Sequence, residues 1–394
     1  MKKSLFALAA MGAFAGVAQA QSSVSVYGIM DAGYATVSNT TAAGGATTGI
    51  QSGGLAASRL GFRGTEDLGK GLRAGFVLES EINTANGSAT GIGSQSANGT
   101  STYSSSQFFN RQSFISLSNN NLGEIRLGLS NTATYDYQIN YDPLKAANLG
   151  GYLNTSTTIA AVTTGPAAAN QTQGGSRGNN AINYISPRIM GAQVRFLSGE
   201  GQAAAGNNLS AGNVAYLRVT DFGLSYIWKN LDAAVSYRLV NSTAGAGATS
   251  TTGVYGSYNF GIVKPYAIYN TSSNKVPGAT AAAQGYSVIS KMVGLEAPIT
   301  PTISVAAQYT MNVNGNVQTA TLSGQSSAVG ALAKYSLSKR TSLYALGAWS
   351  QNAGAGASIA STSKFSGSTA PVVLTGGSKY GDQQGYMLGI NHTF

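Results

Sequence analysis

The amino-acid sequence predicts an all-β protein, a transmembrane antiparallel β-barrel of about 16 strands. Three observations lead to this prediction. Apolar and polar residues alternate along most of the chain, tight turns alternate with long polar loops, and the composition combines 52 Gly and 21 Tyr with only 9% charged residues. Only every second residue of a membrane strand faces lipid, which explains why the mean hydropathy is close to zero.

The clearest strand pair lies at Ser58–Ile82, on either side of the glycine-rich turn 67–71. Successive side chains of a strand point to opposite faces. The even-numbered residues from Leu72 to Leu78 therefore share an apolar face, while the opposite faces of both strands carry charges of both signs. The charged face must meet water, and the apolar face must meet a core or lipid. A surface hairpin of a soluble sandwich would also fit this stretch, but the same pattern continues to the last residue.

The N-terminus predicts a secretory signal peptide, residues 1–20, followed by one barrel domain, residues 21–394. A cationic start precedes an apolar run from Leu5 to Val17 and a small-x-small cleavage site at 18–20. Removing this peptide lowers the net charge from +10 to +8. No later apolar run reaches the roughly 18 residues that a membrane helix requires. An exported chain of this kind belongs in the bacterial envelope, in the periplasm or the outer membrane.

The chemistry-bearing residues favour a protein that is not an enzyme, with no catalytic residues, no cofactor and no metal site. Cysteine is absent, and the single histidine, His392, lies on the predicted lipid face near the C-terminus. Nucleophilic catalysis and soft metal ligation both need such side chains in a shielded site. The sequence contains no phosphate-cradling G-x-x-x-x-G-K-[ST] loop. Its basic residues form no cluster typical of nucleic-acid binding, so nucleic acid is not an expected partner.

Tight turns and long loops alternate along the chain, which favours an outer-membrane barrel over a soluble sandwich. Short turns are predicted at 119–122, 186–191, 229–230, 259–262, 298–301 and 337–340. Long loops rich in Gly, Ser, Thr and Ala are predicted at 38–57, 83–106, 146–178, 199–212, 241–252, 271–284, 312–325 and 352–383. At about 9–11 residues per strand, the mature chain accommodates roughly 14 to 18 strands. A closed barrel of that size encloses an aqueous channel.

The two faces of the predicted strands differ in residue type, as expected if one face contacts lipid and the other lines the lumen. Aromatic residues near strand ends are typical of the girdles at the two lipid interfaces; they are Tyr226, Trp228, Tyr258, Tyr269, Tyr309, Tyr335 and Trp349. The opposite faces carry small residues, which indicate an open lumen; they are Gly61, Gly75, Gly128, Ser236, Ser304 and Gly330. The final strand, Gly385–Phe394, ends on Phe394 with Tyr386 on the same face, and it resembles the terminal signal read by the barrel-assembly machinery.

Seven segments carry a resemblance to a known family. They are SSVSVYGIMDAGY, SRLGFRGTEDLGKGLRAGFVLE, RQSFISL, GEIRLG, SRGNNAINYISP, LSKRTSLYALGAW and GINHTF, which together span the mature chain. With them the chain resembles the trimeric general porins of β-proteobacteria, in the Gram-negative porin family. The resemblance implies a sixteen-stranded barrel in the bacterial outer membrane, a homotrimer, and a third loop folded inward to narrow the pore. It also implies contact with outer-membrane lipid and lipopolysaccharide, and with the barrel-assembly machinery during biogenesis.

The resemblance further implies a pore constriction with basic wall residues facing acidic groups. Arg59, Arg111 and Arg177 match the basic positions, while Glu79 matches a wall acid and Asp142 a loop acid. The alternation alone had already placed Arg59 and Glu79 on the watery face. Further lumen charges are expected at Arg63, Arg73, Glu81 and Arg126, for which mutual pairing is the alternative role. Arginine stays charged in a narrow, low-dielectric passage, where it concentrates anions and opposes cations.

The predicted function is a general diffusion porin, a passive water-filled channel for ions and small hydrophilic solutes with a mild anion preference. A substrate-specific channel is one alternative, and it would need an ordered aromatic lining. The interior aromatics Tyr27, Tyr255 and Tyr266 are scattered in the sequence. A closed structural or adhesin barrel is the other alternative, and the many small lumen residues disfavour it.

Overall fold

The computed structural model describes residues 23–38, 45–88, 108–156, 176–200, 217–242, 247–275, 287–315, 324–353 and 382–394. The predicted signal peptide lies outside these residues, as do most of the loops predicted at 83–106, 199–212 and 352–383. No helix within the described ranges is long and apolar enough to cross a membrane.

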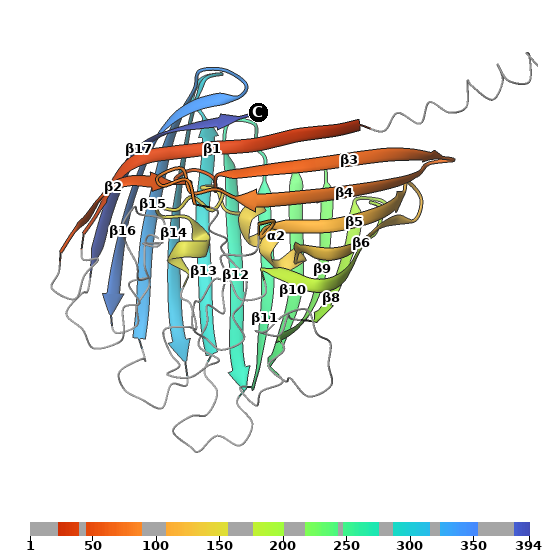
Figure 1. The fold of residues 1–394 in the computed structure, drawn as a ribbon. Helices are drawn as coiled ribbons and strands as arrows, with labels where there is room; N and C mark the ends of the chain where they lie inside the picture. The colour runs from red at the N-terminus through yellow and green to blue at the C-terminus, as the bar shows by residue number, and fades with distance from the viewer. Residues whose placement is uncertain are drawn as a thin grey trace, which may run out of the picture.

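The described chain forms one antiparallel sheet that closes on itself (Figure 1). Its strands are β1 Ser23–Val37, β2 Thr47–Ser52, β3 Arg59–Gly69, β4 Leu72–Glu81, β5 Gln112–Asn119, β6 Gly123–Asn131, β7 Arg177–Ile185, β8 Ala192–Glu200, β9 Leu217–Trp228, β10 Leu231–Ser242, β11 Gly247–Tyr258, β12 Lys264–Lys275, β13 Ser287–Pro298, β14 Ile303–Gly315, β15 Gly324–Ser336, β16 Thr341–Ala353 and β17 Gln383–Thr393. Two short helices, α2 Ala133–Asn140 and α3 Tyr152–Thr155, lie between β6 and β7.

Strand β1 closes the barrel, because β17 pairs with one of its edges along residues 29–37. Its other edge is shared. The half at 23–29 pairs with β3, and the half at 32–37 pairs with β2. β2 and β3 thus form one wall strand that is interrupted at residues 53–58. Counted in this way the barrel has sixteen strands, which confirms the predicted fold class, and its first and last strands pair as a closed barrel requires.

The tight turns lie where the sequence predicts them, but the strands reach further into the polar segments than expected. Strands β10, β11, β12, β14 and β15 extend into the predicted loops 241–252, 271–284 and 312–325, at 241–242, 247–252, 271–275, 312–315 and 324–325. The predicted loop 38–57 likewise contains β2. These expectations were wrong because polarity does not prevent pairing. Ser, Thr and Asn in these segments keep their backbone bonds to a neighbouring strand, and Thr favours the extended conformation.

The outer surface carries the expected aromatic residues, all of which are exposed. Tyr335 lies near the turn rim and pairs with Ile303, while Tyr309 lies six residues further along the same strand as Ile303. At about 3.3 Å per residue the two aromatic levels are roughly 20 Å apart. Apolar residues fill the exposed face between them. This spacing suits the apolar band of an outer-membrane barrel.

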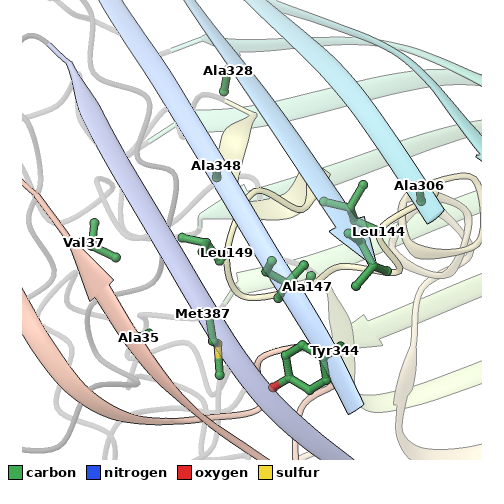
Figure 2. Packing of buried hydrophobic residues seen from close by; sticks show 12 residues of the cluster. Ala35, Val37, Leu144, Ala147, Leu149, Ala306, Ala328, Tyr344, Ala348 and Met387 are labelled. Atoms are coloured by element: carbon green, nitrogen blue, oxygen red, sulfur yellow. The ribbon is translucent and has the colours of Figure 1, made fainter. Parts of the chain in front are cut away.

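Residues 132–156 fold into the barrel, as expected for the third loop (Figure 1). Leu144, Ala147 and Leu149 pack with wall residues that include Ala348 and Met387 in one buried cluster (Figure 2). The small wall residues therefore do more than widen the lumen. A Cβ on Gly330 would lie 2.5 Å from the carbonyl oxygen of Gly150, so this glycine lets the loop approach the wall directly.

Candidate functional site

A buried group of charges lines the lumen side of β3 and β4. Strand alternation places Glu79 and Glu81 on the same face, and the register sets Arg59 opposite Glu81. Arg111, just before β5, donates from Nε to Glu79 Oε1 at 2.6 Å, and its Nη1 lies 3.4 Å from Glu81 Oε2. Arg59 Nη1 lies 3.9 Å from Glu79 Oε1. Tyr27 of β1 donates to Glu79 at 3.0 Å. One wall thus carries both signs of charge in direct contact.

The inward loop begins with α2, which two residues fix in place. Thr132 is the N-cap, and its side chain accepts from the backbone of Tyr135. Asp221 of β9 accepts hydrogen bonds from the backbone of Ala133 at 2.7 Å and from the Thr134 hydroxyl at 2.5 Å. A carboxylate is favoured at the positive end of a helix. The start of the loop is therefore anchored to the wall strand β9.

Helix α2 brings Tyr135 and Asp136 to the arginines. The guanidinium of Arg177 lies 5.2 Å from the centre of the Tyr135 ring, within the range of a cation–π contact. Arg59 and Arg177 each lie within electrostatic reach of Arg111. Asp136 pairs with Arg195 of β8 at 2.7 Å and is the acid that the loop brings to this group. The structure thus brings together the predicted residues Arg59, Arg111, Arg177, Glu79 and Glu81.

The structure places Asp142 elsewhere, which corrects its expected position as a pore acid. The Asp142 side chain is fully buried within the loop. Its carboxylate accepts three backbone hydrogen bonds, from Leu144 at 2.8 Å, Ala146 at 2.9 Å and Tyr152 at 2.8 Å. Burial outweighs these bonds and raises the pKa of Asp142 to about 6. This acid organises the fold of the loop.

The predicted lumen charges Arg63, Arg73 and Arg126 take no part in the ion pairs around Arg111 in the described chain. Arg126 pairs with Glu124 at 2.9 Å near the turn rim. Arg63 donates to Ser25 at 3.2 Å and stacks 5.1 Å from the centre of the Tyr27 ring. Arg73 is exposed at the turn end of β4. Arg63 and Arg126 thus have local structural partners.

A hollow of about 240 Å³ separates the inward loop from the charged wall. Its lining includes Arg59 and Arg111 from the wall side and Tyr135, Asp136 and Lys145 from the loop. The sequence patterns did not indicate Tyr135, Asp136 or Lys145 as site residues, nor Arg195 and Asp221. Asp221 had a visible signal, as a charged residue alternating with apolar neighbours in β9. Lys145 and Asp136 had none, because their positions depend on how the loop folds back.

Comparison with known proteins finds outer-membrane proteins, several of them described as porins. The family model described as "Gram-negative porin" matches residues 7–355. Outer membrane porin protein 32 of Delftia acidovorans is 32% identical, with all of both chains covered. An outer membrane porin protein of Bordetella pertussis is 30% identical, over 89% of this chain and 95% of that one.

Solved structures agree with these sequence matches. The anion-selective porin from Comamonas acidovorans superposes with a TM-score of 0.73 at 28% identity, covering 95% of this chain and all of that one. OmpT, an outer membrane protein of Vibrio cholerae, has a TM-score of 0.63 at 12% identity, covering 95% of this chain and 98% of that one. At that identity the second likeness shows the fold alone.

Proposed function

The chain belongs to the Gram-negative porin family, and from this premise we propose that Arg59, Arg111 and Arg177 form the basic wall of its pore constriction. The protein is an outer-membrane porin. Its water-filled barrel passes ions and small hydrophilic solutes by diffusion, with a mild preference for anions. The similar porin of Comamonas acidovorans carries the description "anion-selective", which supports the same preference here.

The observation that carries the proposal is the charge balance around the hollow between wall and loop. The cations are Arg59, Arg111, Arg177, Arg195 and Lys145, and the carboxylates are Glu79, Glu81 and Asp136. The five cationic side chains outnumber the three carboxylates, so the group as a whole carries a net positive charge. In a narrow passage with low-dielectric walls, such an excess raises the local concentration of anions and repels cations.

The assembly and surroundings of the barrel are part of the same proposal. We infer a homotrimer, surrounded by outer-membrane lipid and lipopolysaccharide. The barrel-assembly machinery would recognise the last strand through Phe394 and Tyr386. Both side chains are exposed on the outer face, and the backbone of Phe394 pairs with Gly28 of β1. We assign no catalytic activity to the chain.

Planar-bilayer recording of the purified protein under a KCl gradient tests the proposed function. We expect ohmic conductance steps that occur in multiples of three, and a reversal potential on the anion side. Arg59→Gln, Arg111→Gln and Arg177→Gln should each move that potential toward cations. Arg340→Gln is the control, because Arg340 lies in the tight turn 337–340 outside the hollow. A folded, inserted barrel without conductance would favour a closed structural or adhesin barrel instead.

A further inference from the structure

The inward loop presents a lysine to the lumen in an unusual backbone conformation. Lys145 and Ala146 are consecutive residues with positive φ, 54° and 60°. This left-handed region costs a residue other than glycine roughly 1–2 kcal/mol. Two such residues in a row persist only where surrounding contacts hold them, and strain of this kind often marks a functional position.

Asp142 supplies the contacts that hold this turn. Its carboxylate accepts from the backbone N–H groups on both sides of Lys145, those of Leu144 and Ala146. The acid is buried by the same turn that exposes the lysine side chain. The turn thereby buries the charge of Asp142 among its own backbone N–H groups and directs the charge of Lys145 outward.

Lys145 lies between two groups of cations. It lines the same hollow as Arg59 and Arg111. Its Nζ donates to the carbonyl of Asn140 at 3.2 Å and lies 5.0 Å from the centre of the Tyr266 ring, on β12.

The second group of cations surrounds Tyr266. Lys264 Nζ lies 5.0 Å from the centre of the same ring. Lys334 of β15 is also within electrostatic reach of Lys145. The acids nearby are Glu296, which accepts from the Tyr266 hydroxyl at 2.9 Å, and Asp232, which accepts from Tyr141 at 2.5 Å. Lys264 and Lys334 lie toward the turn rim of the barrel, so the two groups of cations are at different depths of the lumen.

We propose that Lys145 is a specificity-determining residue of the channel. Its ammonium group joins the wall arginines Arg59 and Arg111 to Lys264 and Lys334. An anion that moves between the two groups of cations then stays close to a positive charge along its path. A cation is repelled by positive charges on both sides of the hollow. This inference rests on the proposed function and adds to it a determinant on the loop.

Reversal potentials of three variants test the role of the Lys145 charge. Lys145→Gln should lower the chloride-over-potassium permeability ratio about two- to threefold, and Lys145→Arg should retain the wild-type ratio. Lys229→Gln is the matched control. Lys229 is also a lysine with positive φ, 51°, but it lies in a tight turn against Trp228. Its substitution should leave the ratio unchanged.

Two further measurements separate charge from loop shape. Lys145→Gly removes the charge and relieves the backbone strain, and it should match Lys145→Gln. The effect of Lys145→Gln on conductance should shrink in about 1 M salt, where the screening length falls to about 3 Å. An unchanged permeability ratio in Lys145→Gln, or an equal loss of the ratio in Lys145→Arg, would overturn this inference. The proposed function would still stand if the wild type prefers anions and Arg111→Gln shifts the reversal potential toward cations. A wild-type channel without anion preference would overturn both.

Discussion

The charged wall and the inward loop face each other across the same hollow, yet they neutralise their acids by different means. On the wall, Glu79 and Glu81 share the guanidinium of Arg111, one strand away. In the loop, Asp142 is held by three backbone N–H groups and no cation touches it within hydrogen-bond distance in the described chain. On the wall, part of the positive charge is neutralised by the wall's own carboxylates. In the loop, the charge of Lys145 is not neutralised by Asp142 and acts on the lumen.

The difference follows from the geometry of strands and turns. In a strand the backbone groups are committed to the ladder, so a buried carboxylate must find a side-chain partner. In a tight turn the N–H groups point inward and are free to bind a carboxylate. The sign of the charge that each region shows to the pore therefore depends on its secondary structure as well as on its composition.

Arg111→Ala should produce the largest effect, because it removes the one cation that both wall acids contact. Breaking a buried ion pair by removing one partner costs about 3–5 kcal/mol, and with only Arg59 and Arg177 left beside the two acids the anion preference should largely disappear. Thermal unfolding and the reversal potential measure the two consequences. The triple variant Arg111→Gln, Glu79→Gln, Glu81→Gln is the control and should recover most of the stability. If the Arg111→Ala variant stays stable and still prefers anions, other side chains must neutralise the two wall acids.

Asp142→Ala should have the next largest effect, and it is confined to the loop. Three buried N–H groups would lose their acceptor at about 1–3 kcal/mol each before relaxation. The loop should leave the wall, so that single-channel conductance rises while the barrel stays folded. Hydrogen exchange at Leu144, Ala146 and Tyr152 reports the loss directly. Asp142→Asn keeps one acceptor oxygen and should be intermediate, and unchanged exchange in Asp142→Ala would contradict the anchoring role.

A smaller effect of pH is expected on the stability of the docked loop. The burial of Asp142 determines whether docking strengthens or weakens as pH rises. Its pKa is about 6 in the folded loop, above its usual value of 3.8. The docked loop therefore binds more protons than the undocked loop between about pH 4 and pH 6, and docking weakens as pH rises through that range. The change is at most about 3 kcal/mol. Amide protection factors of residues 144–152, corrected for intrinsic exchange, should fall with pH in the wild type and stay level in Asp142→Asn. A rise with pH would show that the backbone bonds outweigh burial.

The sequence alone predicted what period-two alternation determines. The hairpin faces, the outward direction of the aromatic side chains and the lumen positions of Arg59 and Glu79 all follow from it, because a side chain in a strand has only two directions to point. The family resemblance extended this to Arg111 and Arg177. It also predicted an inward loop, although not the contacts that hold the loop.

Only the tertiary structure decided which charges of the loop meet the pore. Asp142 and Lys145 are three residues apart in an irregular segment, where no period links sequence position to direction. Asp142 turned inward because distant backbone groups, up to Tyr152, converge on its carboxylate. Asp136 reached the wall because Asp221, far along the chain, fixes the start of α2. Strand faces are a local property of the chain, whereas the direction of a loop side chain is set by partners that only folding brings near.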